Sequence, residues 1–141
     1  MKILIAFNLA AAAAFGSGSA PTFTKDVAPI LQRSCQRCHR PGSIAPMSLL
    51  TYDDARPWAR SMKLQVSTHE MPPWHIDRTV GIQKFVDDPS LTDKEIATIV
   101  RWADGGAQRG NPEDMPPPVQ WAPDDRWGIG KPDVIVSLRT G

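Results

Sequence analysis

Apolar and polar positions follow a helical spacing in three stretches of the chain. The first is TFTKDVAPILQRSC, residues 22–35, whose apolar residues share one helical face: Val27, Ile30 and Leu31. This pattern predicts a helix with Thr24 as its N-cap, and it tolerates Pro29 only because that residue falls in the first turn. The helix would lead directly into RSCQRCHRPG, residues 33–42.

The strongest helical pattern is SLTDKEIATIVRWADGG, residues 90–106. Thr92 and Glu95 have the spacing of a capping box, which marks the start of a helix. The apolar positions form one stripe: Ile96, Ile99, Val100 and Ala103. We predict that Ile99 and Trp102 belong to the core and that the paired glycines after Asp104 end the helix.

A third helix is predicted within TYDDARPWARSMKLQVSTHE, residues 51–70. Pro57 interrupts this stretch, so the helix should begin near Asp53 and Asp54 or at Pro57 itself. Met62 lies within the helical pattern and is expected in the core. The only clear strand-like run is DVIVSL, Asp133–Leu138, and the 14 prolines and 10 glycines indicate many loops.

Charge and the N-terminus limit the possible functions. The net charge of +1 gives no sign of nucleic-acid binding. Lys2, the apolar run ILIAFNLAAAAAF and the small residues GSGSA are typical of an export signal, which we place at residues 1–20, although cleavage after Gly16 or Gly18 competes. The run is shorter than a membrane span, so we expect a protein without a membrane span, in the periplasm or another extracytoplasmic compartment.

Cys35 and Cys38 are the two cysteines of the chain, and several chemistries could use them. A disulfide would close a very small loop and stabilise little. A thioredoxin-like dithiol normally follows a strand, whereas a helix is predicted here. A zinc site requires about four ligands, but the sequence holds no second cysteine pair, and His69 and His75 lie far along the chain.

The remaining interpretation is that CQRCH, residues 35–39, attaches a c-type haem. Two thiols at this spacing can add across the two vinyl groups of the porphyrin, and His39 can then coordinate the iron. An export signal agrees with this interpretation, because c-type haem is attached outside the cytoplasm. The sequence therefore predicts one haem, held covalently by Cys35 and Cys38 with His39 as its proximal ligand.

The ligand on the opposite side of the iron would tune its chemistry: methionine raises the potential, and a second histidine lowers it. Met71, in HEMPPWH, precedes two prolines that stiffen its loop, and we favour it as the distal ligand. Met115, in DMPPP, is the second methionine candidate. His69 and His75 remain rivals, and either would make a bis-histidine centre.

With these motifs in order, the sequence resembles a small class I cytochrome c over residues 23–106. It is most similar to cytochrome c segments found upstream of copper monooxygenase domains in environmental bacteria. The resemblance implies an all-α fold of three to four helices around one covalent haem. It also implies Cys35 and Cys38 as attachment sites, with His39 and Met71 as iron ligands. The carbonyl of Pro46 would accept a hydrogen bond from Nδ1 of His39.

The resulting organisation is a signal at residues 1–20, a cytochrome c domain at 21–109 and an extended proline-rich tail at 110–141. The tail, with Trp121 and Trp127, could wrap the domain, dock a partner or form a linker. We expect an electron carrier between redox partner proteins, or a subunit of a larger redox complex, rather than an enzyme. A haem sensor or peroxidase with a labile sixth ligand is the alternative, and a dithiol or disulfide module without haem is the third possibility.

Overall fold

The computed structural model describes residues 19–74, 76–77, 79–82, 84–121 and 132–136. Every regular element in these residues is helical, so the expected all-α class is confirmed at that level. The expected export signal, residues 1–20, lies outside the described residues except for its last two positions. His75 and Trp127 also lie outside the described residues. No helix in the described part of the chain is long and apolar enough to cross a membrane.

The first helical segment begins with a π-helical turn, Phe23–Val27, and continues as α1, Ala28–Ser34. The prediction that Thr24 is the N-cap is wrong, because Thr24 lies inside the first turn and is buried. The amide of Phe23 donates to the carbonyl of Gln108 (2.9 Å), and that of Thr24 donates to the carbonyl of Arg109 (3.0 Å). A distant segment thus satisfies helix-start amides that a side-chain cap would otherwise serve.

The middle helix is continuous through Pro57. It begins as α2, Tyr52–Ala55, passes through a 3₁₀ turn, Arg56–Trp58, and continues as α3, Ala59–Ser67. It starts one residue before the expected Asp53, because Thr51 and Asp54 form a capping box there. Pro57 cannot donate an amide hydrogen bond, and here the chain tightens to a 3₁₀ turn instead of ending the helix.

The last helix, α4, spans Asp93–Asp104 and confirms the prediction closely. The amide of Thr92 donates to Oε2 of Glu95 (2.8 Å), and the amide of Glu95 donates to Oγ1 of Thr92 (3.3 Å), which completes the capping box. Gly105 caps the C-terminus, and Gly106 follows in the left-handed region with φ 86°.

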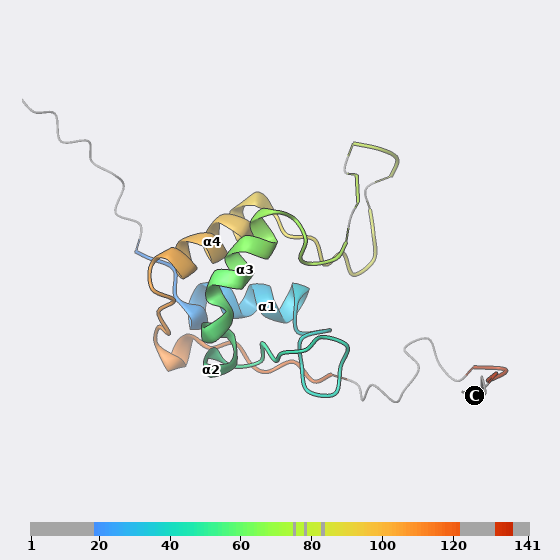
Figure 1. The fold of residues 1–141 in the computed structure, drawn as a ribbon, viewed down its shortest axis with the longest axis horizontal. Coiled ribbons are helices and arrows are strands. Elements are labelled where there is room, and N and C mark those ends of the chain that lie inside the picture. The colour runs from blue at the N-terminus through green and yellow to red at the C-terminus, as the bar shows by residue number, and fades with distance from the viewer. Residues whose placement is uncertain (1–18, 75, 78, 83, 122–131, 137–141) are drawn as a thin grey trace, which may run out of the picture.

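The core lies where the first helical segment meets α3 and α4, which pack against each other (Figure 1). Phe23 contacts the rings of Tyr52 and Trp102, with ring centroids 5.5 and 6.0 Å away. Ile99 and Trp102 are fully buried and Met62 is buried beside them, as predicted. The remaining fully buried large side chains are aliphatic: Val27 and Leu31.

The segment after α4 returns along the first helix (Figure 1). Nε1 of Trp102 donates to the carbonyl of Gln108 (2.9 Å), and the hydroxyl of Tyr52 donates to the carbonyl of Ala107 (3.0 Å). A 3₁₀ turn follows at Pro112–Asp114. Farther on, Nε2 of Gln32 donates to the carbonyl of Pro117 (2.9 Å). Residues 107–117 are therefore joined to the helical body at several points.

The strand-like run at Asp133–Leu138 does not form a strand in its described part, residues 133–136. Val134, Ile135 and Val136 are all exposed. A strand requires a neighbouring strand to satisfy its backbone groups, and β-branched side chains alone do not supply one. The described residues contain no strand with which this run could pair.

Candidate functional site

The CxxCH motif occupies one helical turn beyond the end of α1. The amide of Cys35 donates to the carbonyl of Leu31 (2.9 Å), which continues the helical bonding. The amides of Cys38 and His39 both donate to the carbonyl of Cys35, at 3.1 and 2.9 Å. The turn therefore brings both thiols and the imidazole onto one short, hydrogen-bonded piece of backbone.

The following loop folds back onto this turn. The amide of Leu49 donates to the carbonyl of His39 (3.0 Å), and the amide of Ala45 donates to the carbonyl of Cys38 (3.2 Å). Gln36 is almost fully buried, and its Nε2 donates to the carbonyl of Leu49 (3.0 Å). The sequence did not predict this contact of Gln36, which is one of the two residues between the cysteines of the CxxCH motif. Its only signal in the sequence is a polar side chain at that place.

The two thiols are free in the structure. Burial raises the pKa of the Cys35 thiol to about 12, although the nearby Arg33 opposes the shift. A reactive dithiol needs the opposite, a thiol that ionises readily. No group of three or more His, Cys, Asp or Glu residues that could hold a metal ion occurs among the described residues.

His39 carries an unsatisfied polar atom. Its Nδ1 is buried and has no hydrogen-bond partner in the described part of the chain. The expected bond to the carbonyl of Pro46 is thus not formed here, and Pro46 lies exposed in its loop. Leaving a buried polar group unpaired costs roughly 1–3 kcal/mol, so an orphan imidazole nitrogen is typical of a site that lacks one of its components.

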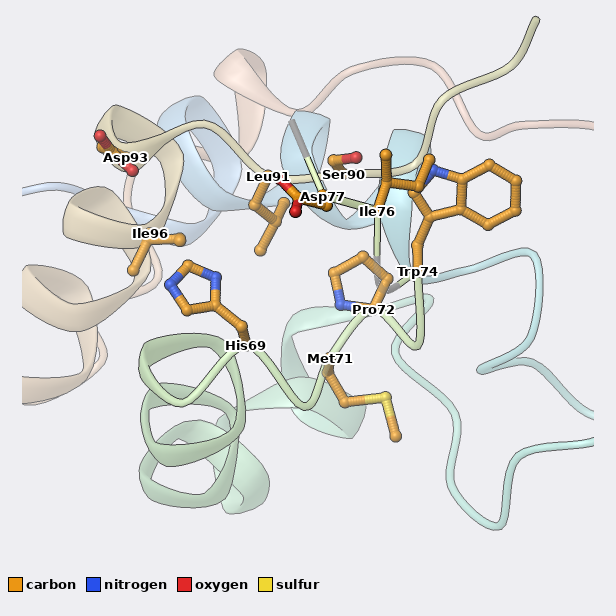
Figure 2. Close-up of a pocket in the computed structure, with 10 residues that line it drawn as sticks. All are labelled: His69, Met71, Pro72, Trp74, Ile76, Asp77, Ser90, Leu91, Asp93 and Ile96. Atoms are coloured by element: carbon orange, nitrogen blue, oxygen red, sulfur yellow. The ribbon is translucent and has the colours of Figure 1, made fainter. Parts of the chain in front are cut away.

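Met71 lies in the loop after α3. The amides of Glu70 and Met71 both donate to the carbonyl of Gln65, at 2.9 and 3.2 Å, and the amide of Trp74 donates to the carbonyl of Pro72 (2.7 Å). The loop is therefore held by turns, as its prolines indicated. The Met71 side chain is 38% exposed, and Figure 2 shows it turned away from the side chain of His69.

A pocket of about 550 Å³ opens between this loop and the start of α4 (Figure 2). One part of its lining consists of apolar residues: Met71, Pro72, Trp74, Ile76, Leu91 and Ile96. Its polar lining consists of His69, Asp77, Ser90 and Asp93. The volume is in the range of small-molecule and cofactor sites.

The candidates for the distal ligand differ in whether they line this pocket. Met71 and His69 both line it, whereas Met115 packs against the hydrophobic core and is not among its described lining residues. His75 lies outside the described residues. Of the two methionine candidates, only Met71 is therefore among the described lining residues of this pocket.

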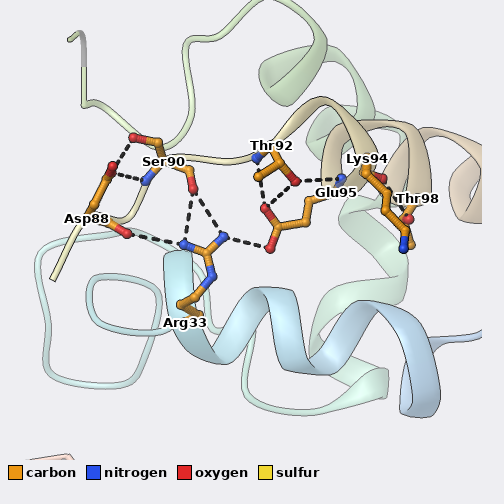
Figure 3. A network of polar contacts seen from close by, with 7 residues as sticks. All are labelled: Arg33, Asp88, Ser90, Thr92, Lys94, Glu95 and Thr98. Carbon is orange, nitrogen blue, oxygen red and sulfur yellow. Dashed lines mark hydrogen bonds and ion pairs between the residues drawn. The ribbon is translucent and has the colours of Figure 1, made fainter. Parts of the chain in front are cut away.

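A network around Arg33 joins the end of α1 to the pocket wall (Figure 3). Its guanidinium donates to the carbonyls of Asp88 and Ser90 and pairs with Oε1 of Glu95 at 2.7 Å. Partial burial by itself raises the pKa of Glu95, but hydrogen bonds from Thr92 and Arg33 outweigh burial and leave this pKa below its usual value. The sequence did not predict the part played by Arg33, because Arg33 lies more than 50 residues from Asp88, Ser90 and Glu95 along the chain.

No family model, curated protein or solved structure matches the chain. The functional conclusion therefore depends on the motif, the helical turn that carries it and the pocket.

Proposed function

We propose that this protein is a mono-haem c-type cytochrome that carries single electrons between redox partner proteins outside the cytoplasm. The observation that carries the proposal is the CxxCH turn, where two free thiols and the imidazole of His39, whose Nδ1 is buried and unpartnered, share one turn at the end of α1. A pocket lined by Met71, with both polar and apolar side chains, adds support.

The residues present fit a covalently attached haem. Cys35 and Cys38 would hold it, and His39 would bind its iron through Nε2, the ring nitrogen other than the unpartnered Nδ1. When bound, a haem supplies a one-electron couple between the ferric and ferrous states. The chain's own contribution is to orient His39 through the Leu49 and Gln36 hydrogen bonds and to exclude water with Leu91 and Ile96.

Attachment is tested by expressing the full chain with a haem-attachment system. We expect covalent haem in a haem-stained gel, the matching increase in intact mass, and a reduced-minus-oxidised spectrum of a c-type centre. Replacing both cysteines by serine should abolish the mass increase. A wild-type protein that carries no covalent haem under these conditions would refute the proposal.

The distal ligand is tested by two matched substitutions, Met71→Leu and Met115→Leu, since leucine keeps the volume of methionine and removes its sulfur. We expect the ferric charge-transfer band typical of methionine ligation to disappear in Met71→Leu and to persist in Met115→Leu. The reverse pattern would assign the ligand to Met115, and a band absent from the wild type would favour histidine.

One observation favours a second candidate function. The Met71 side chain is 38% exposed rather than packed in the core, which is compatible with a weakly held sixth position of the iron. A labile position suits a haem sensor or peroxidase rather than an electron carrier. Carbon monoxide separates the two: rapid binding to the reduced wild-type protein at neutral pH supports the sensor or peroxidase, and slow or absent binding supports the carrier.

A further inference from the structure

Arg33 makes more connections than an ordinary surface ion pair. One guanidinium nitrogen, Nη1, donates to the carbonyls of Asp88 and Ser90, at 3.2 and 3.1 Å. The other, Nη2, donates to the same carbonyl of Ser90 (3.1 Å) and to Oε1 of Glu95 (2.7 Å). Figure 3 shows the guanidinium reaching from α1 to both the 88–90 segment and the first turn of α4.

These contacts join the two halves of the proposed site. Arg33 lies two residues before Cys35, in the last turn of α1. On the other side of the network, Ser90 and the neighbouring Leu91 line the pocket. Glu95 is followed by Ile96, which lines the same pocket from α4. A single side chain thus spans from the cysteine-bearing turn to the pocket wall.

We propose that Arg33 is a positioning residue, which holds the wall formed by residues 88–96 at a set distance from the end of α1. With that distance set, a group tethered at Cys35 and Cys38 would meet the pocket in one orientation, and Met71 would be the residue available there to hold its iron. This inference rests on the proposed haem function, and it adds a residue that the CxxCH and Met-Pro motifs do not include.

The chemistry of the contact requires arginine. An exposed ion pair between two side chains contributes little to stability. Here three of the four hydrogen bonds go to backbone carbonyls, and the planar guanidinium fork can serve them together with the carboxylate. A lysine ammonium is a single point charge. It could keep the contact with Glu95 or with one carbonyl, but it lacks the planar fork that reaches the two carbonyls and the carboxylate together.

Removal of Arg33 leaves the start of α4 capped. Oε2 of Glu95 accepts from the amide and the hydroxyl of Thr92, both at 2.8 Å, and neither bond involves Arg33. A variant at Arg33 should therefore loosen the pocket wall without unfolding the helix. The pair Lys63–Asp104, at 2.5 Å, joins α3 and α4 and provides a matched control, because Lys63 is about as exposed as Arg33.

The first test uses hydrogen exchange on the full chain produced without haem. In Arg33→Gln we expect the amides of Asp88, Ser90 and Leu91 to exchange about tenfold faster, while those of Thr92, Glu95 and α3 keep their rates. Arg33→Lys should not restore the slow exchange, and Lys63→Gln should leave these amides unchanged. Unchanged exchange in Arg33→Gln, or an equal increase across the whole domain, would overturn the positioning role.

The second test uses the same variants after haem attachment. At equal covalent haem content, Arg33→Gln should weaken the methionine charge-transfer band and bind carbon monoxide about tenfold faster, whereas Lys63→Gln should match the wild type. A wild-type band and rate in Arg33→Gln would contradict the inference. If the wild type carries no haem, the proposed function fails, and the exchange experiment still decides whether Arg33 holds the wall.

Discussion

Gly110 offers the sharpest test of how the segment after α4 is joined to the first helix. Its φ of +86° lies in the left-handed region. A Cβ at this position would lie 2.5 Å from Oγ1 of Thr24 and 2.6 Å from both Cβ and Oγ1 of Thr22. Alanine therefore introduces a backbone strain and a collision with two side chains of the opening turn.

The two effects can be given magnitudes. A left-handed conformation costs a residue with a Cβ roughly 1–2 kcal/mol. Relief of the collision requires residues 108–110 to move away from Phe23 and Thr24, whose amides donate to the carbonyls of Gln108 and Arg109. Each lost hydrogen bond costs about 1 kcal/mol. We expect Gly110→Ala to lower the free energy of unfolding by about 3–4 kcal/mol, which corresponds to roughly 10–25 °C in Tm.

The matched control is Gly81→Ala. Gly81 also has a left-handed φ, +69°, but a Cβ there would meet nothing within 4 Å. This variant should show only the backbone strain, about 1–2 kcal/mol. The assay is urea unfolding of the full chain, followed by tryptophan fluorescence and by helical circular dichroism. A loss in Gly110→Ala no larger than that in Gly81→Ala would refute the claim that this junction is close-packed.

Two further predictions concern the cysteine-bearing turn of the haem-free protein. In the folded protein the pKa of Cys35 is raised to about 12, whereas in the unfolded chain this thiol ionises near pH 8.5. Above about pH 8.5 the unfolded state therefore gains stability relative to the folded state. The free energy of unfolding of the wild type should fall by about 1.4 kcal/mol per pH unit. Urea unfolding at several pH values should show a shallower loss in Cys35→Ser, and identical slopes would contradict the burial of this thiol. Gln36→Leu should cost about 1–3 kcal/mol, because it leaves the buried carbonyl of Leu49 unpaired. Gln32→Leu, which removes an exposed bond to Pro117, should cost less than about 1 kcal/mol in the same assay, and equal losses would mean that burial does not set the cost.

The helices that the sequence predicted well are those with local signals. Thr92 and Glu95 are three residues apart, and the glycines that end α4 follow it directly. Both signals act within one helical turn, so they can be found without knowing the fold. The burial of Met62, Ile99 and Trp102 also followed from periodicity, because the apolar face of an amphipathic helix turns toward the core.

The predictions that failed depended on partners far along the chain. Thr24 is of a residue type that often caps a helix. In the structure, however, the carbonyls of Gln108 and Arg109 accept the hydrogen bonds of the first helix amides. The run beginning at Asp133 has β-branched residues, yet its described part has no strand beside it. The hydrogen bond between His39 and Pro46, which the resemblance implies for the haem-bound protein, stays a prediction; in this structure Nδ1 of His39 has no partner among the described residues.

The sequence by itself determined the helical class, the span of α4 and the set of candidate residues, since caps, periodicity and the CxxCH spacing are all local. Only the tertiary structure decided which distant groups meet. It brought Met71, rather than Met115, to the pocket, buried Gln36 against the loop, and joined Arg33 to residues 88–95. The physical reason is that such contacts depend on how the helices pack, and packing joins residues whose separation along the chain carries no signal.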